Sequence, residues 1–209
     1  MCAFAGFLFL ITLYLQEVRG YSALAAGLFL VPMALVMACS APLCGRVIAA
    51  RGTRIPLLIA GTGITAGGIL LTFLSAASAD WYVLLCCVVL GAGMGWVNAP
   101  VTNNAVAGMP RARAGTASGI ASTSRQVGSS LGVAVTGSVL AAGLHGGSLA
   151  SGFASATRPA WSIVAAMGAC VLALTAATTG RAGRASATRA AAIIERADQV
   201  APDHAARAA

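Results

Sequence analysis

Charged side chains are scarce in this sequence of 209 residues, where they make up only 9% of the chain. A soluble domain carries roughly 25% charged residues. Hydrophobic residues account for 58%, which is more than a soluble globule of this size can keep away from water. A buried subunit of a larger soluble assembly is disfavoured, because the apolar residues form long blocks. The composition therefore predicts an integral membrane protein.

Carboxylates are the scarcest charged groups. The chain has five acidic and 13 basic residues, every basic residue is arginine, and the net charge is +8. Glu17 and Asp80 lie at the ends of hydrophobic blocks, and Glu195, Asp198 and Asp203 lie near the C-terminus. A proton-coupled carrier usually needs an ionisable residue within the membrane. Either the protein is not proton-coupled, or the coupling residue lies in a part that this sequence does not contain.

Metal-binding and catalytic patterns are also missing. The chain has two histidines and six cysteines, without the spacing of a metal site. The glycine-rich run at 91–95 follows no predicted strand, so we interpret it as helix packing rather than a nucleotide-binding turn. We predict no catalytic residue, cofactor, metal or enzymatic activity. The cysteines are interpreted as apolar packing residues: Cys2, Cys39, Cys44, Cys86, Cys87 and Cys170.

Six long hydrophobic blocks dominate what is present. A membrane-crossing helix needs about 20 apolar residues, and backbone polar groups within lipid must be paired inside the helix. The predicted fold class is an all-α membrane protein with a six-transmembrane-helix bundle at 1–180. An Arg/Ala-rich cytoplasmic tail follows at 181–209, with a short surface helix around 187–198. The predicted spans are 2–15, 23–44, 55–76, 81–103, 122–144 and 160–179.

The arginines are distributed unevenly between the two ends of these spans. One side would hold the connection after the second span, the connection after the fourth span and the tail. These parts contain 10 arginines, whereas the other side holds only Arg19 and Arg158. Short arginine-rich connections stay in the cytoplasm, so both termini are predicted to be cytoplasmic, in the cell membrane. Tyr14, Trp81 and Trp161 near span ends are predicted to be interfacial anchors. The arginine-rich side comprises Arg46, Arg51, Arg54, Arg111, Arg113, Arg181, Arg184, Arg189, Arg196 and Arg207.

Polar side chains inside the predicted spans are few. Asn98 lies toward the cytoplasmic end of the fourth span, Trp96 lies inside that span and Gln126 begins the fifth. We interpret Trp96, Asn98 and Gln126 as the lining of a substrate path, because a polar group in lipid needs water or a partner. The alternative for these residues is hydrogen bonding between helices.

Arg125, Gly128 and Gly132 are assigned a structural or gating role. Arg125 lies at the membrane edge, where it can snorkel toward the interface. Gly128 and Gly132 form a small-xxx-small pair that lets helices approach closely. Pro100 in the fourth span can kink its helix, as Pro32 and Pro42 can in the second.

Three stretches together resemble one family, the major facilitator superfamily in its fourteen-helix drug:proton antiporter branch. Residues 14–22 (YLQEVRGYS) are similar to the outer turn that opens the second half of these carriers. Residues 45–54 (GRVIAARGTR) resemble the cytoplasmic loop motif. Residues 115–132, with GTASG followed by RQVG, resemble the penultimate span.

The resemblance implies a gating role for Gly45, Arg51, Gly52 and Arg54 in the cytoplasmic loop motif. The family's aspartate would fall at Ala49, so a charge pair that is thought to lock neighbouring helices is lost. This departure weakens the gating interpretation and leaves the resemblance in place.

The resemblance further implies that the chain is the C-terminal half of a carrier. Such a protein would be a secondary active transporter that exports small amphipathic compounds by proton antiport with alternating access. Its partners would be protons, a small-molecule substrate, the lipid bilayer and the missing N-terminal half, with no nucleic acid. The coupling carboxylate would lie in that other half, and the fragment would be inactive alone. The alternative is a stand-alone membrane scaffold or accessory subunit without transport activity.

Overall fold

The computed structural model describes residues 1–101, 111–144 and 149–179, and in these ranges the regular structure is helical throughout. The chain divides into two compact units, Met1–Leu172 and Ala173–Ala209. The predicted tail and its surface helix lie outside the described residues. The elements are α1 (Cys2–Leu13), the π-helical turn η1 (Tyr14–Val18), α2 (Ala23–Arg51), α3 (Arg54–Thr72), α4 (Asp80–Gly95), α6 (Arg111–Leu144) and α7 (Leu149–Thr179).

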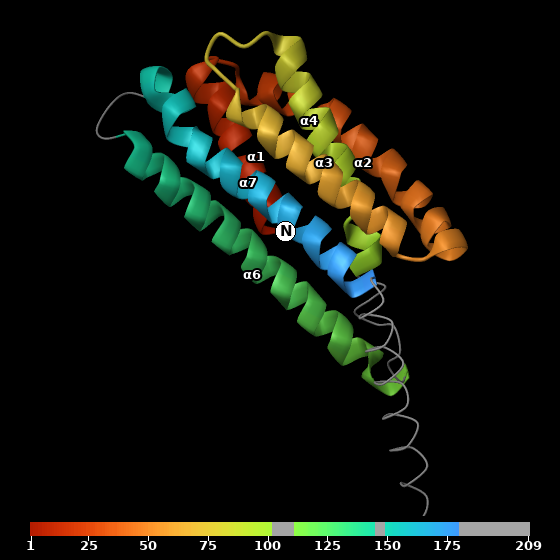
Figure 1. The fold of residues 1–209 in the computed structure, drawn as a ribbon. Helices are drawn as coiled ribbons and strands as arrows, with labels where there is room; N and C mark the ends of the chain where they lie inside the picture. Colours follow the sequence, from red (N-terminus) through yellow and green to blue (C-terminus); the bar gives the residue numbers. More distant parts are fainter. Residues whose placement is uncertain (102–110, 145–148, 180–209) are drawn as a thin grey trace, which may run out of the picture. The chain divides into compact units, whose positions relative to one another are not determined.

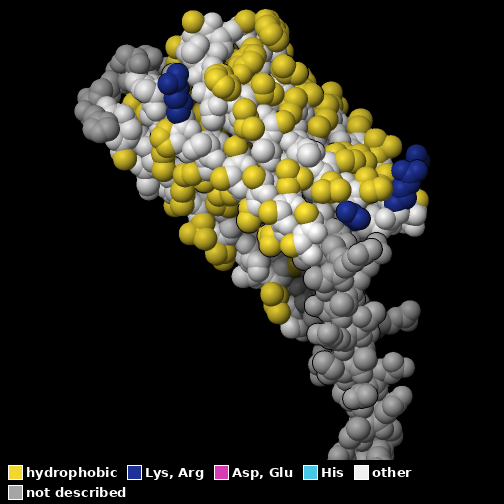
Figure 2. All heavy atoms as spheres, in the orientation of Figure 1, with side chains coloured by type: hydrophobic (Ala, Val, Ile, Leu, Met, Phe, Trp, Pro, Cys, Tyr) yellow, Lys and Arg dark blue, Asp and Glu magenta, His cyan; other side chains and the backbone are white. Residues whose placement is uncertain are grey.

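Five helical segments of the described residues are long and apolar enough to cross a membrane. A shorter apolar helix at Cys2–Val18 accompanies them. On the face shown in Figure 2, hydrophobic side chains spread along the helices and the arginines lie near helix ends. The prediction of an all-α membrane bundle is confirmed. The five segments are Ala23–Arg51, Arg54–Thr72, Asp80–Val101, Ser118–Leu144 and Ser155–Ala177.

Within the first unit, α4 packs against both α2 and α3, and α1 packs along α6 (Figure 1). Phe7 of α1 lies against Trp161 of α7, with ring centroids 6.2 Å apart. Trp161 and Tyr14 are fully buried, so the prediction that they are interfacial anchors is wrong. Trp161 lies well inside α7, because that helix begins 11 residues earlier than the predicted span. Trp81, by contrast, is 67% exposed.

Glycines bring several of these helices into backbone contact. A Cβ added at Gly63 of α3 would lie 2.7 Å from the Cα of Gly93 in α4. A Cβ at Gly91 would meet the side chain of Met33, and one at Gly95 would meet Ser40, both in α2. The interpretation of residues 91–95 as a packing surface is confirmed, because these glycines let α4 fit between α2 and α3.

Three helices extend beyond the predicted spans. Helix α2 continues to Arg51, α6 begins at Arg111 and α7 begins at Leu149. Hydroxyl side chains are common in the extensions of α6 and α7, and they bond to carbonyls of their own helix, as Ser118 does to Gly115 at 2.8 Å. Such bonding lets a polar stretch stay helical. Hydropathy therefore predicts the membrane-crossing part of each helix but not its full length.

Candidate functional site

A cavity of about 320 Å³ lies beside the end of the fourth span and the middle of α6. Its walls are mainly apolar, and its polar side chains are Asn98, Ser124 and Arg125. An apolar hollow with a few polar groups is the usual form of a small-molecule site. The lining residues are Met1, Cys2, Val97, Asn98, Val101, Ala121, Ser124, Arg125 and Gly128.

The residues predicted to line a substrate path lie in different surroundings. Asn98 is exposed and lies on the cavity wall. Trp96 is half-buried, and its carbonyl accepts a contact from the Cys44 thiol at 3.7 Å. Gln126 is exposed on α6, and its carbonyl accepts a hydrogen bond from Ser130 at 3.2 Å. Neither Trp96 nor Gln126 belongs to the cavity wall, whereas Arg125 does.

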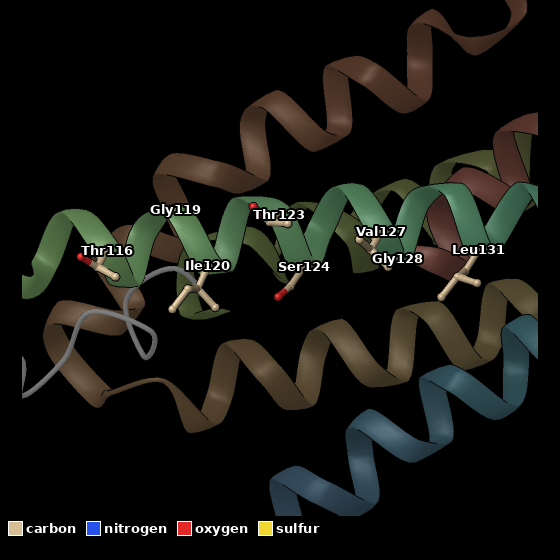
Figure 3. Close-up of a pocket in the computed structure, with 8 residues that line it drawn as sticks. All are labelled: Thr116, Gly119, Ile120, Thr123, Ser124, Val127, Gly128 and Leu131. Atoms are coloured by element: carbon tan, nitrogen blue, oxygen red, sulfur yellow. The ribbon is translucent and has the colours of Figure 1, made fainter.

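A second hollow of about 740 Å³ runs along one face of α6 (Figure 3). Hydroxyl groups of Thr116, Thr123 and Ser124 alternate there with Ile120 and other apolar side chains. Ser124 and Gly128 line both hollows. The lining residues are Thr116, Gly119, Ile120, Thr123, Ser124, Val127, Gly128 and Leu131.

Gly128 and Gly132 lie where α1 meets α6. A Cβ at Gly132 would overlap the carbonyl oxygen of Cys2, whereas one at Gly128 would lie 3.7 Å from the backbone nitrogen of Cys2. One turn further, Thr136 sits against Gly6. The structure therefore places Gly132 at a close helix contact and Gly128 at its edge, beside the cavity.

Residues of the predicted loop motif occupy the end of α2 and the start of α3. Gly45 and Arg51 lie within α2, so the connection itself consists of Gly52 and Thr53. Gly52 adopts φ 77°, a conformation that favours glycine, and ends the helix. Arg51 and Arg54 are both exposed. The expected loop from residue 45 is therefore mostly helix, since the apolar run after Arg46 continues α2.

A polar cluster at the opposite end of the helices was not predicted from the sequence. The guanidinium of Arg19, after η1, pairs with the Asp80 carboxylate at the start of α4 and donates to the Ser78 carbonyl. Tyr21 donates to the other Asp80 oxygen at 3.0 Å, and Tyr14 donates to the Ser75 carbonyl at 2.8 Å. We call Tyr14, Arg19, Tyr21 and Asp80 the clasp.

The clasp joins residues about 60 positions apart in the chain. Burial lowers the Arg19 pKa, but contacts with Tyr14 and Tyr21 and the charge of Asp80 raise it, and the net shift is upward. The guanidinium therefore stays charged at every physiological pH. The only sequence signal was that the polar run at 14–22 and Asp80 both lie on the arginine-poor side.

No group of three or more histidines, cysteines or carboxylates that could hold a metal occurs in the part of the chain that the structure describes. The chemistry available around the cavity is therefore apolar contact, hydrogen bonding from Asn98 and Ser124, and the positive charge of Arg125. These groups can bind and release a small molecule.

A multi-pass bundle of apolar helices that pack closely through glycines defines an all-helical membrane protein. Residues 1–133 match the family model described as Major Facilitator Superfamily. The chain belongs to this superfamily, whose members are generally carriers without enzymatic activity.

Several relatives of this chain are named as resistance or export proteins. It is 40% identical over 139 residues to the multidrug resistance protein Stp of Mycobacterium tuberculosis, covering 66% of this chain and 26% of that protein. It is 37% identical over 140 residues to the tetracenomycin C resistance and export protein of Streptomyces glaucescens, covering 66% and 26%. The quinolone resistance protein NorB of Staphylococcus aureus is 30% identical over 141 residues, covering 66% and 30%. The chain thus spans about a quarter of the length of the first two relatives.

Proposed function

We propose that this chain forms the C-terminal helical bundle of an exporter of small amphipathic compounds, in the fourteen-helix drug:proton antiporter branch. The cavity beside α6 carries the proposal, because its apolar walls and three polar side chains suit an amphipathic molecule. The export role in the name of the tetracenomycin C resistance and export protein supports the direction of transport. The driving force would be proton exchange, and the mechanism would be alternating access around a site near the bilayer midplane.

Asn98 is the residue that we propose contacts substrate from this half, with Arg125 at the edge of the cavity as a gating residue. Trp96 and Gln126 lie outside the lining of this cavity. In this proposal they line a part of the substrate path beyond it. Gly128 and Gly132 would fix α1 against α6, and the motif residues Gly45, Arg51, Gly52 and Arg54 would act in gating at the connection between α2 and α3.

Proton coupling requires a second part. Glu17 and Asp80 are the carboxylates among the described residues; Asp80 is held in the clasp, and Glu17 is exposed. We therefore propose that the coupling carboxylate comes from an N-terminal half and that the chain alone does not export.

Vesicles containing only this polypeptide are expected to show no dye export driven by a pH gradient. Co-reconstitution with the N-terminal helices of a full-length export relative, ending where its match to this chain begins, is expected to restore export. An Asn98→Ala variant should then reduce export of amphipathic dyes. Robust export by the chain alone would refute the need for a second half. A combination that inserts and associates but never exports would favour the scaffold or accessory subunit.

We also propose that both termini are cytoplasmic and that the clasp lies on the outer side of the cell membrane. A single cysteine replacing Ala77, between α3 and α4, is expected to react with an impermeant thiol reagent added to intact cells. A cysteine replacing Ala49, near the end of α2, should react only after the membrane is opened. Both positions are exposed in the bundle, so burial does not confound the comparison. The reverse pattern of labelling would invert the topology.

A further inference from the structure

The fourth span is interrupted at Trp96 and Val97. Helix α4 ends at Gly95, and Trp96 has φ −91° and ψ −4°. The backbone nitrogens of Trp96 and Val97 bond to the carbonyls of Gly93 and Met94, each at 3.2 Å. These bonds join residues three apart, as in a 3₁₀ turn. Residues 98–101 then resume a helix, with Val101 bonded to Val97 at 3.2 Å.

Pro100 accounts for the interruption. An α-helix pairs each carbonyl with the N–H four residues later, and Pro100 has no N–H to offer Trp96. The Trp96 carbonyl is contacted instead by the thiol of Cys44, a fully buried residue of α2, at 3.7 Å. A weak bond from a neighbouring helix has therefore replaced the bond that would hold the two halves of the span in line.

Packing differs on the two sides of this break. Before it, Gly91, Gly93 and Gly95 hold α4 so closely that a Cβ at any of them would come within 3.0 Å of α2 or α3. After it, Asn98 is exposed, Val101 is 41% exposed, and of residues 98–101 only Pro100 is buried. The first segment is therefore held by close glycine contacts on two sides, whereas the second is mostly outside the packed core.

The less restrained segment forms one wall of the cavity. Val97, Asn98 and Val101 line it from the fourth span, and Ala121 and Ser124 line it from α6. A change of about 25° at the break, acting over the roughly 7 Å between Trp96 and Val101 along the axis, would move Val101 by about 3 Å. A movement of that size would change the width of a cavity of this volume.

We propose that the break at Trp96 and Val97 is a hinge, that residues 98–101 are the movable wall of the cavity, and that the Cys44 thiol holds the hinge in one of its two positions. This proposal concerns only the described helices and does not depend on what the chain transports.

Distances between spin labels test the hinge in the full chain in lipid nanodiscs. The background carries Cys2→Ala, Cys39→Ala and Cys170→Ala, which removes the cysteines that are not buried. One label is placed at Leu28→Cys in α2 and the other at Val101→Cys beyond the break. In the control pair, the second label is at Leu85→Cys, before the break. Leu28, Val101 and Leu85 are all substantially exposed.

We expect two populations of distances for the pair at 28 and 101 and one narrow population for the control pair. Pro100→Ala gives the Trp96 carbonyl its helical partner, so it should remove one of the two populations. Circular dichroism should show that its helix content has not fallen. Cys44→Val should shift the populations, whereas Cys44→Ser, which keeps a donor, should shift them less.

A single narrow population at 101, or two populations that Pro100→Ala leaves unchanged, would overturn the hinge. If Pro100→Ala removes one population but Cys44→Val alters nothing, the role of the thiol is overturned. None of these measurements depends on transport. The hinge can therefore be overturned while the proposed function holds, and the proposed function can be overturned while the hinge holds.

Discussion

Replacing Gly93 with alanine is expected to destabilise the bundle by about 2 kcal/mol, because overpacking a close contact typically costs 1–3 kcal/mol. A Cβ at Gly93 would lie 2.7 Å from the backbone nitrogen of Ile64, 2.9 Å from the carbonyl carbon of Gly63 and 3.0 Å from the carbonyl oxygen of Ala60. All three atoms are backbone atoms of α3, so no side-chain rotation can relieve the overlap. Helices α3 and α4 must move apart.

The native cysteines provide the measurement. Cys44, Cys86 and Cys87 are buried, so a maleimide dye that fluoresces on reaction reports their exposure when the bundle melts. With the accessible cysteines blocked beforehand, Gly93→Ala should lower the Tm by about 4–8 °C, taking 2–4 °C per kcal/mol for a chain of this size.

Two alanine variants control for the general effect of losing a glycine. At Gly91 the nearest atom is the Cγ of Met33, a flexible side chain that can turn away, and the nearest backbone atom is the Met33 carbonyl oxygen at 3.1 Å, so Gly91→Ala should cost less than Gly93→Ala. At Gly27 nothing lies within 4 Å of an added Cβ, and alanine is the better helix former. Gly27→Ala should be neutral or slightly stabilising. Equal Tm values for Gly93→Ala and Gly27→Ala would contradict the close contact between α3 and α4.

The sequence predicted most of the fold because lipid leaves the backbone few options. Each hydrophobic block became a helix, and the glycines at 91–95 packed as interpreted. The early start of α6 was missed, since its first turns are rich in serine, threonine and arginine, which lower hydropathy without preventing a helix. Trp161 was misplaced for the same reason, because the start of α7 was set too late.

The candidate site was harder to predict, because it depends on which helices face one another. Asn98 and Arg125 share a cavity wall only because α6 passes the end of the fourth span, and a single sequence does not contain that pairing. Pro100 indicated a kink, but the contact of Trp96 with Cys44 joins residues 52 positions apart. The clasp could not be predicted from the sequence either, because Arg19 and Asp80 are 61 positions apart. Each of them alone is an ordinary charged residue at the end of a span.

Breaking the clasp is expected to loosen the end of the bundle at which α1, α2 and α4 meet. Asp80 accepts from Arg19 and from Tyr21, and as an acidic residue in the first turn of α4 it also favours the helix dipole. Hydrogen bonds to charged groups contribute about 1.5–3 kcal/mol each. The side chain of Arg19 is 18% exposed and that of Asp80 is 52% exposed, so solvent screening reduces the effect. We expect Asp80→Asn to destabilise the bundle by about 1–2 kcal/mol.

A double-mutant cycle separates the pair from its surroundings. Arg19→Gln, Asp80→Asn and the double variant are compared by the same dye-based melting, and the two single effects should sum to more than the double effect by about 1 kcal/mol. Glu17→Gln is the matched control, because Glu17 is an exposed carboxylate in η1, two residues before Arg19, and it should leave the Tm unchanged.

Salt gives this prediction a second, independent readout. The Debye length falls from about 10 Å at 0.1 M to about 3 Å at 1 M salt, so the coupling between Arg19 and Asp80 should shrink as salt rises. The neutral bond from Tyr14 to the Ser75 carbonyl should persist and hold η1 against the turn before α4. A coupling of zero at low salt would show that the two charges act separately. A coupling that 1 M salt leaves unchanged would show that hydrogen-bond geometry, rather than charge, holds the clasp together.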